Sequence, residues 1–196
     1  TMENERKSAK TLHQAVADGD LAEVRRLIAE GADVNAKNQR DMTPLMWGWY
    51  TDGLTKEVAE LLIEHGADVD AQDDEGMTSL HGAIYVDIGK DIVSLLISKS
   101  TDVNLTTEEG WTSLHYAIVM GDIDTVKLLV DKGADFNVKN QEGWTSLRRA
   151  ALDGRRDMVE IFIGRGADAS SFHMAAFMGD LSRVKEFVEK GTEVDT

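Results

Sequence analysis

Apolar residues recur along this chain at intervals of three and four positions, in short runs that glycines interrupt. The stretch from Gly110 to Gly133 shows the pattern most clearly, because polar positions separate two sets of apolar ones. This spacing predicts two short helices with one apolar stripe each, formed by Leu114, Ala117 and Ile118 and then by Ile123, Val126, Leu129 and Val130. At roughly 8 to 10 residues, each helix is shorter than the ~12–15 residues that an isolated helix needs in water. The pair must therefore bury its stripes against neighbouring elements.

Residues that favour helix ends bound each of these two helices. Thr112 can accept a backbone N–H at the start of the first helix, and His115 lies three residues later, where its side chain can reach back to the cap. Gly121 can adopt the left-handed conformation that ends this helix. Asp122 can then cap the second helix, which Gly133 ends in the same way. The order of these residues predicts a helix pair with a tight joint.

Close copies of this stretch occur before and after it. The second helix of each copy ends, in order, at Gly31, Gly66, Ser100, Gly133, Gly166 and Gly191, so that successive ends are separated by 35, 34, 33, 33 and 25 residues. A period of this length is typical of repeat proteins, in which each unit buries its apolar face against the next.

Three helix starts and three linkers resemble the ankyrin repeat family: Thr43–Leu45, Thr78–His81 and Thr112–His115, with the linkers at 31–35, 66–70 and 133–137. The resemblance covers nearly the whole chain, from Lys10 to Asp195. It implies an all-α solenoid of about six helix-turn-helix units. Antiparallel helix pairs would stack side by side, and each linker would form a projecting β-hairpin loop.

The expected organisation is a polar leader at residues 1–9 and an ankyrin repeat domain at 10–196, with units at 10–38, 39–73, 74–107, 108–140, 141–169 and 170–196. Only four residues lead from Gly166 to the helix start at Ser170, whereas twelve lead from Gly133 to Thr145. We therefore expect the hairpin between units five and six to be missing. Because unit six resembles unit one and the chain stops where another hairpin would start, we expect the natural protein to continue into further repeats.

Composition narrows the classes of function. The chain of 196 residues is 42% hydrophobic, which is enough to bury a core, and its lack of cysteine excludes disulfides, thiolate metal sites and cysteine nucleophiles. A net charge of −15 repels phosphate backbones and anionic lipids, so we expect neither nucleic acid nor a membrane as partner. No apolar run approaches the ~18 residues that a membrane span needs. The absence of cysteine fits a reducing compartment, and the expected location is cytoplasmic.

Histidines and paired acids are the residues that could suggest catalysis or metal binding. Four of the five histidines occupy the same position in successive units, namely His13, His81, His115 and His173. A metal ion needs ligands that converge within about 2 Å, whereas equivalent positions lie one repeat apart, so we expect each imidazole to bond near its own helix start. Asp18 and Asp20 flank Gly19 at a helix joint, where a cap explains them better than an acid/base pair. With no known catalytic motif present, we expect no enzyme activity, no metal and no cofactor.

In ankyrin-like units the concave side carries the hairpin tip, the residue after its glycine and the end of the first helix. The resemblance therefore implies a partner-binding set with apolar members Tyr50, Met77, Tyr85, Trp111, Met120, Trp144 and Leu152, and acidic members Asp74, Glu75, Glu108, Glu109 and Glu142. Val119, Phe177 and Met178 occupy similar positions. An aromatic and apolar strip beside an acidic rim suits a protein-binding surface, because the apolar groups supply contact area and the charges steer and select.

The tryptophans allow more than one interpretation. Trp111 and Trp144 could contact a partner, or they could pack on adjacent hairpins and stiffen the stack, and the two roles are compatible. Trp47 and Trp49 lie within the first helix of unit two, and there we favour packing.

These patterns predict a non-catalytic protein interaction module, whose partner is another protein with a basic or a mixed basic and apolar segment. One alternative is a small-ligand sensor, in which Trp111 and Trp144 sandwich a ring; another is a regulatory ankyrin domain of a larger enzyme or channel. We expect a monomer or a weak end-to-end dimer, because apolar residues of unit six lack a following repeat: Phe172, Met174, Phe177 and Val188.

Overall fold

The computed structural model describes residues 10–167 and residue 179. The described residues form ten α-helices: α1 (Leu12–Ala17), α2 (Leu21–Ala29), α3 (Pro44–Tyr50), α4 (Lys56–Glu64), α5 (Ser79–Tyr85), α6 (Lys90–Lys99), α7 (Ser113–Met120), α8 (Ile123–Asp131), α9 (Ser146–Leu152) and α10 (Arg156–Gly164). The chain divides into two compact units, residues 1–108 and 109–196, which we call the first and second half. The expected sixth repeat, the missing hairpin before it and the positions of His173, Phe177 and Met178 lie outside the described residues.

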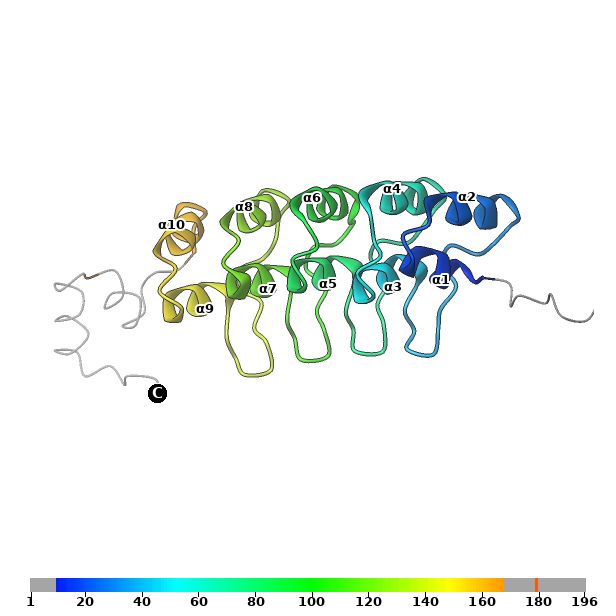
Figure 1. Ribbon diagram of the computed structural model, residues 1–196. Helices are drawn as coiled ribbons and strands as arrows, with labels where there is room; N and C mark the ends of the chain where they lie inside the picture. The colour runs from blue at the N-terminus through cyan, green and yellow to red at the C-terminus, as the bar shows by residue number, and fades with distance from the viewer. Residues whose placement is uncertain (1–9, 168–178, 180–196) are drawn as a thin grey trace, which may run out of the picture. The chain divides into compact units, whose positions relative to one another are not determined.

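Helix pairs stack in two rows within the first half (Figure 1). Helices α1, α3 and α5 lie side by side in one row, and α2, α4 and α6 lie side by side in the other. The loops that precede α3 and α5 extend beyond the row of odd-numbered helices (Figure 1). The described part of the first half is therefore a paired and stacked all-α arrangement.

The second half repeats this plan with fewer helices. Helix α7 packs beside α9, α8 packs beside α10, and each odd-numbered helix also contacts the even-numbered helix that follows it. The loop before α9 extends past α7 and α9 (Figure 1). Both halves thus keep the helix order that the sequence period predicts.

Apolar stripes of the short helices supply the core. Leu114, Ala117 and Ile118, the predicted stripe of α7, are completely buried. Full burial of one such leucine or isoleucine contributes about 1.5–3 kcal/mol relative to exposure. Because each of the described helices has at most ten residues, this burial between neighbours, rather than helix propensity, stabilises the elements.

Threonine caps start all five odd-numbered helices, with side chains that accept a backbone N–H: Thr11, Thr43, Thr78, Thr112 and Thr145. The imidazole of His115 completes the cap of α7, because its Nδ1 accepts the Thr112 N–H at 3.2 Å. His81 does the same for Thr78 at 3.0 Å. The prediction that these histidines bond at their own helix start is confirmed for both residues.

Loop tips join into a ladder within each half. Asn38 N–H donates to the Met42 carbonyl, Asp73 N–H to that of Met77 and Asn140 N–H to that of Trp144, each at 3.0 Å. Neighbouring tips are linked as well, for example by a bond of 3.2 Å from Asp74 N–H to the Arg40 carbonyl. These bonds hold the tips in place, whereas the β-strand character of the loops stays a prediction.

Two loops of the first half also anchor the end of the following helix pair. The Asn35 amide accepts the Asp68 N–H at 2.8 Å and donates to the Gly66 carbonyl at 2.9 Å. One repeat later Asp70 takes this position, and its carboxylate accepts bonds from the Ser100 hydroxyl and the Thr101 N–H, both at 2.7 Å. Asp70 thus pairs with Ser100, the residue that stands at the helix end where other units have glycine.

Candidate functional site

The predicted partner-binding residues of the first half lie at loop tips and at the ends of odd-numbered helices. Tyr50 ends α3 and Tyr85 ends the neighbouring α5, and their side chains are 50% and 58% exposed. Met77 is half-buried in the loop before α5, whereas Asp74, Glu75 and Glu108 are exposed. The two tyrosines are thus large, partly apolar side chains that the fold leaves in water.

The second half presents a similar set. Met120 ends α7 and Leu152 ends the neighbouring α9, with 43% and 54% of their surface exposed. Glu109 and Glu142 are exposed at the loop tips, and Trp111 and Trp144 are half-buried. We use the name inner face for the set in each half, each described within its own half; its residues are the twelve that the sequence analysis assigned to partner binding.

Arg40 contacts three residues of the inner face of the first half, and sequence reasoning missed it. Its Nη2 donates to the Glu75 carboxylate at 3.0 Å, and its Nε lies 4.0 Å from the Asp74 carboxylate. The guanidinium also lies over the Tyr50 ring, 5.1 Å from the ring centroid. Two acids of the expected rim are therefore paired with an arginine of the preceding loop.

Two tryptophan rings pack against the Tyr50 ring. The Trp47 ring stacks on it with centroids 5.3 Å apart, and the Trp49 ring meets it edge-on at 5.9 Å. Trp49 is buried against α5, where a Cβ on Gly82 would lie 2.1 Å from the indole. The packing role predicted for Trp49 is confirmed, and Trp47 positions the exposed tyrosine.

Trp111 and Trp144 contact residues of the helix that follows each of them. The Trp111 ring lies 5.8 Å from the His115 ring and 5.4 Å from the Tyr116 ring. Trp144 is flanked by the guanidinium groups of Arg148 and Arg149, at 5.6 and 5.7 Å from its ring centroid. These contacts lie within one repeat, so packing on adjacent hairpins and contact with a partner both stay predictions.

The surroundings of His115 on α7 favour its neutral form. Burial lowers the pKa of His115, the nearby charge of Arg149 acts in the same direction, and a bond with the Trp144 carbonyl at 3.2 Å opposes both. Because Nδ1 accepts the hydrogen bond of the cap, Nε2 carries the proton and donates a hydrogen bond to the Trp144 carbonyl. The imidazole therefore links a helix start to the next loop.

His13 makes the same kind of link, since its Nε2 lies 3.0 Å from the Met42 carbonyl. Within the part of the chain that the structure describes, no group of three or more His, Asp and Glu side chains is arranged to hold a metal ion.

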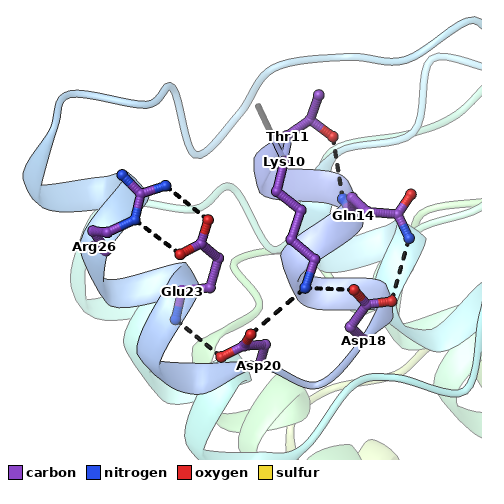
Figure 2. Close-up of polar contacts among 7 residues, drawn as sticks. All are labelled: Lys10, Thr11, Gln14, Asp18, Asp20, Glu23 and Arg26. Carbon is purple, nitrogen blue, oxygen red and sulfur yellow. Dashed lines mark hydrogen bonds and ion pairs between the residues drawn. The ribbon is translucent and has the colours of Figure 1, made fainter. Parts of the chain in front are cut away.

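Acidic residues at the joint between α1 and α2 form ion pairs and a helix cap (Figure 2). The Lys10 ammonium lies 2.6 Å from the Asp18 carboxylate and 3.5 Å from that of Asp20. Asp20 also accepts the Glu23 N–H at 3.1 Å as the cap of α2. The prediction that Asp18 and Asp20 form a helix joint and a cap is thus confirmed, because Asp18 is the C-terminal cap residue of α1 and Asp20 caps α2. Asp18 also forms an ion pair with Lys10.

Comparison with known families agrees with this geometry. The family model described as ankyrin repeats (3 copies) matches residues 12–107 and 84–173. A comparison with curated protein sequences gave no match. Among the described helices, none has the length and apolar character that a membrane crossing requires.

Proposed function

The chain belongs to the ankyrin repeat family, and from this premise we propose that it is a non-catalytic module that binds a partner protein on its inner face. The residues at 10–196 would form the binding domain, with the unit boundaries expected from the period. The observation that carries the proposal is the exposure of Tyr50 and Tyr85 at the ends of two adjacent helices. Neither exposed ring is needed to fill the core.

The physical character of the inner face supports binding to a protein. Tyrosine provides a large contact area at a small entropic cost, methionine adapts its shape to a partner, and aromatic residues are enriched where interfaces are strongest. Tyr50 and Tyr85 stand on packed helices, so they lose little freedom when a partner covers them. Met120 and Leu152 offer the same kind of contact on the second half.

The charge of the chain favours a basic partner segment. The net charge is −15, and exposed acids lie at loop tips beside the apolar members of the inner face, among them Glu108, Glu109 and Glu142. Charges at the edge of an interface mainly accelerate association and select among partners. A segment that alternates basic and apolar residues would match both features.

The alternative of a small-ligand sensor has less support. A ring held between Trp111 and Trp144 would have to share the Trp144 ring with Arg148 and Arg149, which already lie against it. A regulatory role within a larger enzyme or channel is compatible with the same inner face, because such a domain also acts by binding.

Partner capture with matched variants tests the proposal. The full chain is immobilised as wild type, as the double variant Tyr50→Ala/Tyr85→Ala and as the control Leu128→Ala, which removes a side chain that is 40% exposed on α8 and outside the inner face. We expect wild type and the control to retain a partner protein that the double variant does not retain. Truncation of a hot-spot residue reduces the free energy of binding by about 2 kcal/mol or more. Equal retention by all three proteins would refute the assignment of the face.

A further inference from the structure

The guanidinium of Arg40 occupies a cation site whose walls are residues of the inner face. The Tyr50 ring lies beneath its guanidinium, and the Glu75 carboxylate accepts its Nη2 at 3.0 Å. The second carboxylate, that of Asp74, lies 4.0 Å from Nε. Two acids and one aromatic face thus surround a single positive charge, which leaves this place with a surplus of negative charge.

The Tyr50 ring and the main chain around this site are held by contacts that do not involve the Arg40 side chain. Tyr50 is stacked on Trp47, and Asp74 is tied to the loop before it by its N–H bond to the Arg40 carbonyl at 3.2 Å. The main chain of Arg40 is held by two hydrogen bonds. Its carbonyl accepts this Asp74 N–H, and its N–H donates to the Asn38 side chain at 2.9 Å. The long side chain of Arg40 can therefore leave without disturbing the loop.

Displacement of Arg40 requires little free energy. Its side chain is 38% exposed, and that of Glu75 is 62% exposed. Exposed ion pairs contribute little to stability, and a cation–π contact in water is similarly weak. An incoming cation that brings further contacts would therefore displace the resident one.

We propose that Tyr50, Asp74 and Glu75 form a binding subsite for an arginine side chain of the partner, and that Arg40 is an internal competitor for it. This inference rests on the proposed function and specifies which chemical group of the basic partner segment is held here. A guanidinium suits the subsite better than an ammonium, because its plane stacks on the tyrosine while its fork of N–H groups bonds the carboxylates. Arg40 itself adopts the geometry that the partner's arginine would take.

The test uses the full chain, a synthetic probe and a charge-matched control. Arg40→Gln removes the competitor, whereas Arg25→Gln removes the same charge from an exposed position of α2. Both variants and wild type are titrated at constant ionic strength with acetyl-tetra-arginine amide and acetyl-tetra-lysine amide. Dissociation constants and binding positions are taken from NMR shifts of the backbone amides of Tyr50, Asp74 and Glu75.

We expect Arg40→Gln to bind the arginine probe about three- to tenfold more tightly than Arg25→Gln does, with shifts at the three named amides. Addition of Tyr50→Ala to Arg40→Gln should abolish this gain, and the lysine probe should gain less. The proposal is overturned if both glutamine variants gain equally, since net charge would then explain the effect, or if the shifts lie elsewhere.

The two proposals fail in different ways. If a partner is captured through Tyr50 and Tyr85 but Arg40→Gln gains nothing, the subsite is wrong and the binding function stands. If the arginine probe binds at the subsite while no captured protein depends on the tyrosines, the subsite stands and the proposed function is wrong.

Discussion

Replacement of Asp70 by alanine should destabilise the first half by about 2 kcal/mol, because the carboxylate connects one loop to the end of the next helix pair. Its oxygens accept the Ser100 hydroxyl and the Thr101 N–H at 2.7 Å, the Thr101 hydroxyl, and more weakly the Asp102 N–H at 3.3 Å. Ser100 is buried, so its hydroxyl would lose its partner without full access to water.

The magnitude follows from the kinds of bond that are lost. Hydrogen bonds to a charged acceptor contribute about 1.5–3 kcal/mol each in favourable cases, but Thr101 and Asp102 are exposed and water can replace Asp70 as their acceptor. The buried Ser100 hydroxyl and one charged bond to Thr101 therefore dominate the loss. Asp70→Asn should cost about 1 kcal/mol, because the amide keeps one acceptor but gives up the charge.

The same carboxylate predicts a dependence of stability on pH. Burial tends to raise the pKa of Asp70, but the bonds from Thr101, Ser100 and Asp102 outweigh it and lower the pKa below the ordinary value of 3.8. A group whose pKa is lower in the folded state contributes stability above the unfolded pKa and loses it as the pH falls through the folded pKa. Wild type should therefore lose stability below about pH 4 more steeply than Asp70→Ala.

Urea denaturation of wild type, Asp70→Ala, Asp70→Asn and Glu64→Gln, followed by circular dichroism at pH 7 and at low pH, measures both effects. Glu64 is an exposed carboxylate at the end of α4 and serves as a control for loss of one charge, with an expected change below about 0.5 kcal/mol. If Asp70→Ala unfolds at the same urea concentration as the control, the proposed connection between loop and helix end contributes no stability. An unchanged pH dependence would contradict the assignment of the lowered pKa.

Further predictions concern glycines and the acidic tips. Gly82→Ala should destabilise the fold by about 2 kcal/mol or more, because a Cβ there would lie 2.1 Å from the Trp49 indole. Gly164→Ala in α10 should stabilise the fold by about 0.5 kcal/mol, because a Cβ there would meet no described neighbour within 4 Å. Thermal unfolding compares the two variants, and equal effects would contradict the tight Trp49 contact. With a captured partner, reversal of charge at Glu108 and Glu109 should slow association by about tenfold at low salt and less at high salt, while Trp111→Ala should mainly accelerate dissociation. Stopped-flow or surface-binding kinetics would separate the two rates, and unchanged rates for both variants would exclude these residues from the interface.

Much of the scaffold could be predicted from local sequence. Partners only three residues apart form the caps at Thr78 and Thr112, with the imidazoles of His81 and His115, and the cap at Asp20. Bonds over such short distances follow from helix geometry, so the spacing of residue types is enough to predict them.

The contacts that give the inner face its character depend on long side chains and on distant partners. Arg40 reaches Glu75, 35 residues later, and Arg148 and Arg149 cover Trp144. A free arginine can adopt many rotamers, and sequence alone does not indicate which one a neighbouring loop favours. The match of Asp70 to Ser100 and Thr101 did leave a signal in the sequence. Asp70 stands at the position that Asn35 has in the preceding unit, and Ser100 and Thr101 stand at the positions of Gly66 and Ala67.

The position of the partner can be measured by hydroxyl-radical footprinting of the full chain with and without the captured protein. This method reports the solvent exposure of single side chains. Four suitable side chains are exposed and belong to residue types that hydroxyl radicals oxidise, namely Tyr50, Tyr85, Met120 and Leu128 on α8. Binding on the inner face predicts that the partner protects Tyr50, Tyr85 and Met120 from oxidation and leaves Leu128 unchanged. Protection of Leu128 with continued oxidation of the two tyrosines would contradict it.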